Sequence, residues 1–262
     1  MKKYLGIIKM VILEKMQFLA SKIVTLIMYA IFIYLFLQLW QYMYGEDSLI
    51  AGYTLSQMVW YVAITEMFWF GIRPKSMMDE ITMEIKSGKV AYILNKPFSY
   101  IGYMLSKYLG ETIISFLLHL VVGIIVGLVI IGKLSTFSIA AIPFIAITMI
   151  LTTFITAFIY MLIAMLSFWF EDNSPFFWLY EKLTLAVGVI FPIEIFPLFL
   201  QPFIKLSPIY VTMYAPAKMF IDFEIGMFFE LLAFQLAYLL LTMFLVIFVY
   251  RKGVKILSVN GG

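Results

Sequence analysis

The sequence contains no cysteine, so disulfide bonds, thiolate metal sites and cysteine nucleophiles are excluded. Charged residues are scarce as well, at 13% of 262 residues, whereas 64% are hydrophobic and the mean hydropathy is +1.03. A soluble globular protein of this composition would expose far too much apolar surface to water. We therefore expect an integral membrane protein.

Histidine is nearly absent too, since His119 stands alone. No second ligand lies within helical reach of it, so we expect no metal site and predict that His119 makes a hydrogen bond between helices. The net charge of +3 is too small to indicate binding to nucleic acid. There is no G-x-S-x-G elbow and no paired intramembrane carboxylates, so we expect no catalytic residues in this chain.

Apolar runs of the length that crosses a bilayer, about 20 residues for about 30 Å, recur along the whole chain. Helices satisfy the backbone there, so the predicted fold is an all-α single transmembrane domain over residues 1–262. Residues 1–22 mix lysines with apolar residues at helical spacing, which predicts an interfacial helix that is not cleaved. Six transmembrane helices are predicted at residues 23–44, 53–72, 108–131, 139–170, 183–200 and 228–250.

The basic residues orient the chain. If six spans alternate in direction, all but three of the 18 Lys and Arg residues lie in loops and termini on the same side of the membrane. The exceptions are Lys133, Lys205 and Lys218. Positive loops face the cytoplasm. Both termini, including the basic tail RKGVKILSVNGG, and the long loop at residues 73–107 are therefore predicted to be cytoplasmic.

This cytoplasmic loop is the longest polar interruption in the chain. Ser76 stands three residues before Asp79, which predicts a capped helix start after Pro74. Gly88 offers a stop, and a second short helix is predicted for residues 89–96, ended by Pro97. Two interfacial helices packed on the bilayer or on neighbouring spans, and a docking site for another protein, both agree with this pattern.

Prolines break the chain beyond residue 190. The run GVIFPIEIFP contains Pro192 and Pro197, which cannot sit in an undisturbed helix. Residues 201–227 carry three more prolines among aromatics, and we expect them to lie in the outer interface or dip into the membrane.

Three segments carry a family resemblance that covers most of the chain. They are SGKVAYILNKPFS in the cytoplasmic loop, GVIFPIEIFP, and the terminal RKGVKILSVNGG. In this order over six spans, the chain resembles permease subunits of the ABC-2 type exporter family, and looks most like the branch of multidrug and peptide-antibiotic efflux permeases.

The resemblance implies a cytoplasmic coupling helix between the second and third spans, and external re-entrant helices between the fifth and sixth. It implies cytoplasmic ABC ATPase subunits as partners, which bind the ATP and Mg²⁺, and a second permease copy or a homologous permease. It places ATPase contacts at Met78, Asp79, Glu80, Ile81, Glu84 and Ile85, with Gly88 and Pro97 shaping the connector. It places an external gate at Gly188, Pro192, Glu194 and Pro197.

One segment of the chain partly matches a nucleotide-binding motif. Residues 127–133, GLVIIGK, match part of a phosphate-binding loop, but Leu134 replaces the magnesium-binding hydroxyl and the segment ends a membrane helix. We therefore expect no ATPase activity here. Gly123 and Gly127 in the same span indicate close helix packing, within the chain more readily than in a dimer.

The expected function is ATP-driven export of an amphipathic or hydrophobic compound across the inner membrane of a prokaryote. An ion-coupled secondary transporter is the alternative, for which Glu66 inside a span is the candidate, although pairing within the structure is its favoured role. Glu111 is a further ionisable residue in a span, with its role open.

Overall fold

The computed structural model describes residues 2–72, 74–94 and 96–260. Within that part of the chain the regular elements are all helices, and an isolated antiparallel bridge joins Ile50 to Tyr53. Positions 1, 73, 95 and 261–262, which belong to the predicted interfacial helix, cytoplasmic loop and basic tail, lie outside the described residues. The all-α prediction is confirmed.

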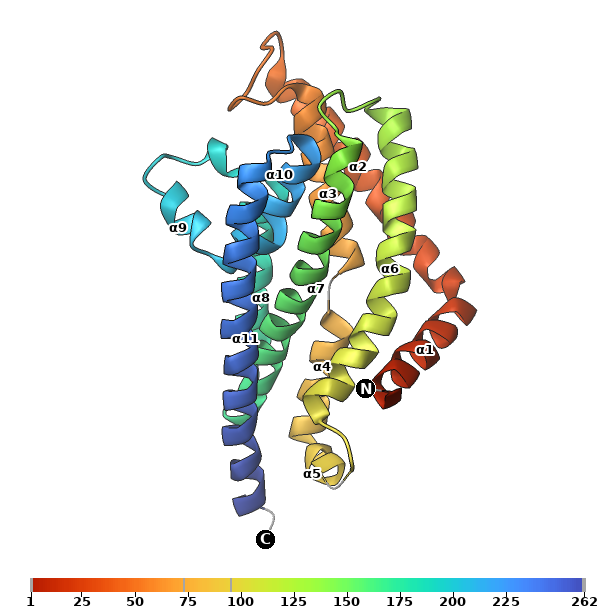
Figure 1. The fold of residues 1–262 in the computed structure, drawn as a ribbon, viewed down its shortest axis with the longest axis vertical. Helices are drawn as coiled ribbons and strands as arrows, with labels where there is room; N and C mark the ends of the chain where they lie inside the picture. The colour runs from red at the N-terminus through yellow and green to blue at the C-terminus, as the bar shows by residue number, and fades with distance from the viewer. Residues whose placement is uncertain (1, 73, 95, 261–262) are drawn as a thin grey trace.

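The long helices run side by side along the long axis of the molecule, and α1 lies tilted on one flank, beside α6 (Figure 1). Two π-helical stretches, Leu185–Ile190 and Tyr210–Tyr214, follow α8 and precede α10. The helices are α1 (Lys2–Gln17), α2 (Ile23–Tyr44), α3 (Leu55–Gly71), α4 (Lys75–Lys86), α5 (Lys89–Leu94), α6 (Tyr100–Ile130), α7 (Ile142–Met165), α8 (Ser174–Thr184), α9 (Gln201–Lys205), α10 (Ala215–Ile221) and α11 (Ile225–Asn260).

Four helical segments of the described chain are long and apolar enough to cross a membrane. They are Leu19–Tyr44, Tyr100–Ile130, Ile139–Phe168 and Ile225–Ile256. Most side chains of the first, second and fourth are not buried, which suits helices that face lipid, whereas 61% of the third is buried.

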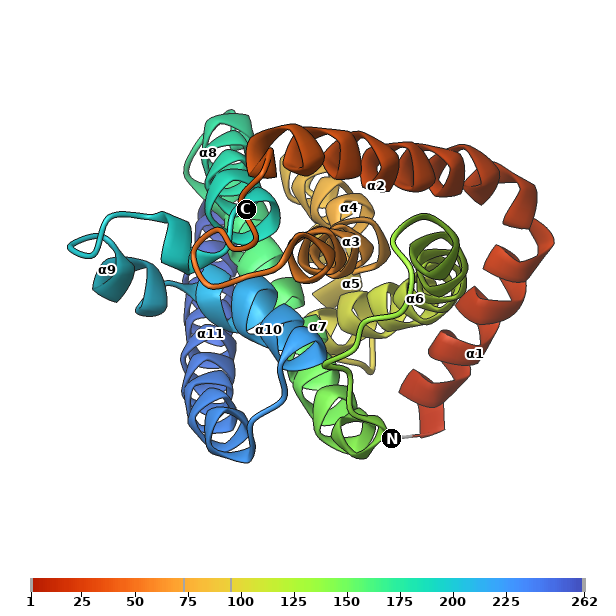
Figure 2. The same ribbon diagram turned by 90° about the horizontal axis from the view of Figure 1, so that it is seen from above.

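α3 is the central helix. It has 17 residues, about 25 Å at about 1.5 Å per residue. It packs against α2, α6, α10 and Leu185–Ile190, and Figure 2 shows it enclosed by the other helices. Thr54 begins it with a capping box, in which Thr54 Oγ1 accepts a hydrogen bond from the Gln57 amide. Burial on all sides explains how so short a helix is held in place.

Glycines let α6 approach its neighbours closely. A Cβ at Gly123 would lie 2.3 Å from the Tyr29 hydroxyl of α2, and one at Gly127 would lie 2.4 Å from the Trp60 ring of α3. Both glycines therefore serve packing within the chain, as the sequence favoured.

Several helix boundaries differ from the prediction. α6 begins at Tyr100, so the end of the predicted cytoplasmic loop is helical. The fifth long helical segment covers α8 and Leu185–Ile190 instead of residues 183–200, because Pro175 suits the first turn of a helix and Pro192 cannot continue one. The predicted basic tail is the last part of α11, which continues to Asn260.

Candidate functional site

The inner face of α4 is apolar and fully packed. This helix lies toward the α5 end of the molecule, where it contacts α7 and the short helix Leu166–Phe168. Met78, Ile81 and Ile85 are each at most 3% exposed. In this structure these three predicted coupling residues therefore hold α4 on the helix bundle, and their side chains do not form its outer surface.

Glu84, a fourth predicted coupling residue, is only 4% exposed. Its carboxylate accepts a hydrogen bond from Tyr100 Oη at 3.0 Å and pairs with Lys89 Nζ at 2.9 Å. This contact raises the pKa of Lys89 above its usual value, because the carboxylate stabilises the protonated amine. The Tyr100 ring stacks on Tyr250 of α11, with centroids 5.5 Å apart. Glu84 thus connects α4 to α5 and α6 directly, and to α11 through Tyr100.

Asp79 and Glu80 are half-buried, and one of them pairs within α4 whereas the other pairs with another helix. Lys107 of α6 donates to Glu80 Oε2 at 2.6 Å. Asp79 pairs with Lys75, one turn earlier on α4 itself. Glu80 therefore ties α4 to a long helix, whereas Asp79 stabilises only the first turns of α4.

Ser76 does not cap α4, contrary to the sequence prediction. The helix starts after Pro74 without a side-chain cap, and Ser76 already lies inside its first turn. The Ser76 hydroxyl donates instead to Glu111 Oε2 of α6 at 2.8 Å. Glu111 Oε1 accepts a hydrogen bond from Lys15 Nζ of α1 at 3.1 Å. Glu111 therefore links α1, α4 and α6, which a local pattern could not show.

The turn from α4 to α5 is the exposed part of this region. Gly88 ends α4 with φ of +71°, a conformation that favours glycine. Met83 is 63% exposed and Tyr92 is 68% exposed. Lys86 and Ser87 are exposed beside them. We call these five residues the α4–α5 corner, a basic surface with two large apolar side chains.

The segment after α5 is held by α1. Lys3 donates a hydrogen bond to the carbonyl of Pro97, the predicted connector residue. The Ser99 amide donates to Tyr4 Oη at 3.0 Å. α1 also packs along α6, so the predicted interfacial helix contacts both the predicted cytoplasmic loop and the helix that follows it.

At the opposite end, Gly188 lies where two π-helical stretches meet. A Cβ there would lie 2.6 Å from Ile209 Cγ2 and 2.9 Å from Met213 Cβ. Tyr61 of α3 donates its hydroxyl proton to the Gly188 carbonyl at 2.7 Å. The Thr65 hydroxyl lies 2.9 Å from the carbonyl of Val189, to which it donates. These side chains satisfy carbonyls that an α-helix would have paired internally.

The other predicted gate residues surround the helix break. Pro192 has extended backbone and precedes the single turn Ile193–Ile195. Pro197 accepts a hydrogen bond from the Leu200 amide in the next turn. Glu194 accepts a hydrogen bond from the Tyr214 hydroxyl. The structure thus brings Gly188 and Glu194 against the stretch Tyr210–Tyr214, while Pro192 and Pro197 shape the connection.

Residues 26–261 match the family model described as ABC-2 family transporter protein. The match covers nearly the whole chain, including the α4–α5 corner and the broken helices at the other end. This chain belongs to the ABC-2 transporter family. A search among curated proteins found no match.

Membership identifies the chain as a membrane protein of a permease type, a component that generally lacks ATPase motifs. The partial match to a phosphate-binding loop at residues 127–133 agrees with this role. These residues form the end of α6 and the turn at Gly132, and not a loop between a strand and a helix. In the part of the chain that the structure describes, no three His, Asp or Glu side chains are grouped to hold a metal ion.

His119 and Glu66 are buried in this ABC-2 transporter, at 1% and 3% exposure. His119 Nδ1 lies 2.7 Å from the Ser115 carbonyl of the same helix, so the predicted hydrogen bond between helices is wrong. Its ring stacks on Phe70 of α3 instead. Within residues 2–72, 74–94 and 96–260, no hydrogen bond or ion pair to the Glu66 carboxyl is present.

Sequence reasoning missed the roles of Tyr100, Lys107 and Tyr250. Tyr100 and Lys107 lie inside the predicted loop at residues 73–107 but were not among its predicted coupling residues, and Tyr250 ends the predicted sixth span. Lys107 and Glu111 are one turn apart near the start of an apolar run, which is a detectable signal of inward-facing partners. Tyr100 stacks on Tyr250, which is 150 positions further along the chain, and no local sequence pattern predicts such a contact.

Proposed function

We propose that this chain is the permease subunit of an ATP-driven ABC-2 exporter, and that a separate ATPase docks at the α4–α5 corner. The observation that carries the proposal is the two-sided character of α4 and α5. Glu84 and Glu80 attach the inner side to α6, and Glu84 reaches α11 through Tyr100, while Met83 and Tyr92 stand exposed on the outer side. A partner bound to the outer side could therefore move α4 and α5, and the bonds on the inner side would transmit that movement to the other helices.

The proposal divides the predicted coupling residues by role. Asp79, Glu80 and Gly88 remain candidates for contact with the ATPase, because they are half-buried or exposed. Met78, Ile81, Glu84 and Ile85 transmit movement from within, because they are buried. Pro97 positions the return to α6. The ATPase subunits bind the ATP and Mg²⁺.

Within this proposal the chain crosses the membrane six times, with α3 and α8–Ile190 as the two short crossings. Both termini and the α4–α5 corner are cytoplasmic, which the distribution of lysines and arginines supports. Two permease subunits form the exporter in the inner membrane of a prokaryote. Gly188, Pro192, Glu194 and Pro197 shape its outer gate, and the apolar character of the helices favours an amphipathic or hydrophobic cargo.

Assembly with the cognate ABC ATPase, sought first in the neighbouring reading frames, tests the proposal. Met83→Asp and Tyr92→Asp change exposed side chains, so the permease still folds. Each is expected to weaken co-purification of the ATPase by about tenfold or more, the effect of losing an apolar contact at an interface centre. The control Gln17→Asp adds the same charge at an exposed position of α1. Undiminished co-purification of both variants would overturn the docking site.

The alternative of an ion-coupled transporter draws on Glu66, a buried carboxyl at a central helix. It predicts transport by this chain alone in liposomes under an ion gradient, abolished by Glu66→Gln. Our proposal predicts no gradient-driven transport without the ATPase.

A further inference from the structure

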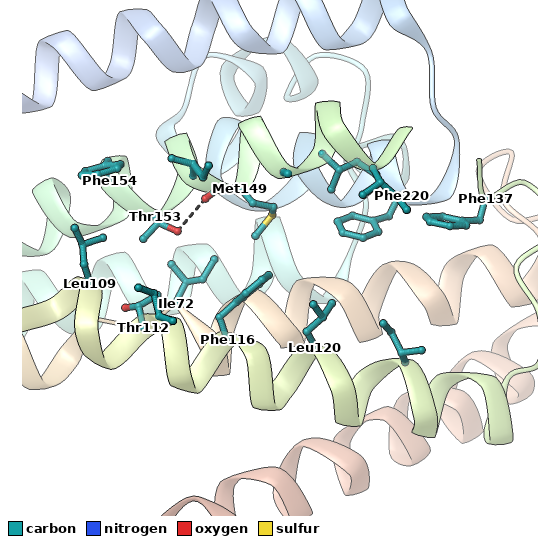
Figure 3. Close-up of a pocket in the computed structure, with 16 residues that line it drawn as sticks. Ile72, Leu109, Thr112, Phe116, Leu120, Phe137, Met149, Thr153, Phe154 and Phe220 are labelled. Atoms are coloured by element: carbon teal, nitrogen blue, oxygen red, sulfur yellow. Dashed lines mark hydrogen bonds between the residues drawn. The ribbon is translucent and has the colours of Figure 1, made fainter. Parts of the chain in front are cut away.

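An apolar groove separates α6 from α7. α6 packs on α1, α2 and α3, whereas α7 packs mainly on α11 and α4. Between them lies a cavity of about 580 Å³, shown in Figure 3. Leu109, Phe116 and Leu120 line it from α6, and Met149 and Phe154 line it from α7. The volume falls within the range of about 300–1,000 Å³ that is typical of small-molecule sites.

This groove continues into a second cavity of about 380 Å³ between α3 and α6. The two cavities share the lining residues Leu120, Ile124, Phe137 and Phe220, so they lie next to each other and form one continuous stretch of apolar lining. We call the two cavities together the α6–α7 groove. It extends from Leu109, near the start of α6, past the end of that helix.

The groove offers water almost nothing to bind. The hydroxyl of Thr153, one of its few polar groups, donates to the Met149 carbonyl at 2.9 Å (Figure 3). An apolar cavity stays dry, and an empty one loses the dispersion contacts of its lining. In a membrane protein, hydrocarbon from the bilayer is the material at hand to fill it.

One end of the groove is charged. Lys133, which follows α6, lines the second cavity and is exposed, and it is the charged residue of the lining. No acidic side chain in the described ranges pairs with it, in contrast to Lys15, Lys107 and Lys218. An apolar passage that ends at an unpaired ammonium group complements a molecule with a hydrocarbon tail and an anionic head.

We propose that the α6–α7 groove holds an acyl chain of an anionic membrane lipid, with the lipid phosphate at Lys133. The lipid completes the packing between α6 and α7. Because Lys133 lies at the end of α6 away from the α4–α5 corner, the headgroup belongs to the leaflet on that side. The proposal depends on the membrane location of the chain and not on its coupling to an ATPase.

A filling substitution tests the tail site. Ala146→Trp places an indole in the groove, because Ala146 lines the cavity from α7. The control Ile147→Trp changes the next residue, which is 44% exposed and does not line the cavity. Lipid bound to the purified protein is measured by native mass spectrometry. Ala146→Trp is expected to lose most bound phospholipid and Ile147→Trp to retain it.

Equal retention by wild type and Ala146→Trp would overturn the proposal. Should Ala146→Trp prove misfolded by gel filtration, Ala146→Leu, a smaller change, is measured in its place, with the same expected loss and the same overturning result.

A charge substitution tests the head site. Wild type is exchanged into mixed phosphatidylglycerol and phosphatidylcholine with identical chains, and the bound ratio is compared with that of Lys133→Gln. The preference for phosphatidylglycerol is expected to fall by about fivefold, the effect of one cation near an anionic headgroup. Lys205→Gln, an exposed lysine on the same side, is the control. An unchanged preference in Lys133→Gln would overturn the assignment of the head.

Discussion

The two ends of this ABC-2 transporter are built on different chemistry. At the α4–α5 end, acidic side chains such as Glu84, Glu80 and Glu111 join separate helices by ion pairs and hydrogen bonds. At the other end, Gly188 and the tyrosines Tyr61 and Tyr214 do so through close packing and hydrogen bonds. Directional charged contacts keep α4 attached as a unit, whereas the broken helix at the other end is held mainly by tyrosine and threonine hydroxyls that donate to backbone carbonyls, with Glu194 as the acidic acceptor of Tyr214.

This contrast agrees with the proposed function, in which a separate ATPase moves the α4–α5 end. A rigid receiver transmits displacement, and a helix break with its carbonyls held by neighbouring hydroxyls supplies the place where the far end can change conformation. Four substitutions test the contrast.

The largest effect is expected at the close-packed end. Gly188→Leu inserts a side chain where a Cβ alone would lie 2.6 Å from Ile209, so the free energy of unfolding should fall by about 3 kcal/mol, the upper part of the usual cost of overpacking. Thermal unfolding in detergent measures it. Gly226→Leu is the control, since a Cβ there meets no atom within 4 Å. Similar melting temperatures for the two variants would show that the gate region is not closely packed.

A smaller effect is expected at the charged end. Glu84→Ala removes the acceptor of Tyr100 and the partner of Lys89, and should cost about 2 kcal/mol, the value of a hydrogen bond to a charged group. Binding of the ATPase should persist, because the exposed side chains of the α4–α5 corner are unchanged. The stimulation of ATP hydrolysis on assembly of the complex should fall, because the hydrogen bond from Tyr100 of α6 to α4 is lost. Tyr100→Phe in the Glu84→Ala background should add little. If the losses in free energy of unfolding from Glu84→Ala and Tyr100→Phe were fully additive, the hydrogen bond between these two side chains would be contradicted.

The Ser76 hydrogen bond is expected to matter less. Ser76→Ala should cost about 0.5–1 kcal/mol, as a hydrogen bond at the protein surface does. Its effect should be non-additive with Glu111→Gln and additive with Asp79→Ala, measured by thermal unfolding of the double variants. The reverse pattern would restore a capping role for Ser76.

The smallest effect concerns pH. The pKa of Lys89 is raised by Glu84, so this pair stabilises the fold fully below the unfolded lysine pKa of about 10.4, and the stabilisation is lost as pH rises through the higher folded value. The difference in melting temperature between wild type and Lys89→Met should therefore shrink above about pH 10.4. A constant difference from pH 8 to pH 11 would argue against the pair.

Much of the molecule was predictable because the bilayer imposes simple rules. Hydrocarbon requires long apolar helices, so the all-α class and the regions of α2, α6, α7 and α11 follow from apolar runs alone. The stop at Gly88 also follows from local chemistry, since glycine adopts positive φ at low cost.

Other predictions failed where a local pattern competed with a distant partner. Ser76 had the spacing of a cap, yet the hydroxyl found Glu111, 35 residues away. His119 was expected to bond another helix, yet its own helix supplied the carbonyl.

The amino-acid order was thus enough to establish a helical membrane protein with a polar interruption at one end and proline breaks at the other, because both are properties of consecutive residues. Folding in three dimensions settled which residues of α4 face inward, that Glu84 and Glu111 connect distant helices, and that a groove separates α6 from α7. Those features depend on distances between segments far apart in the chain, and such distances arise from packing and not from any local pattern.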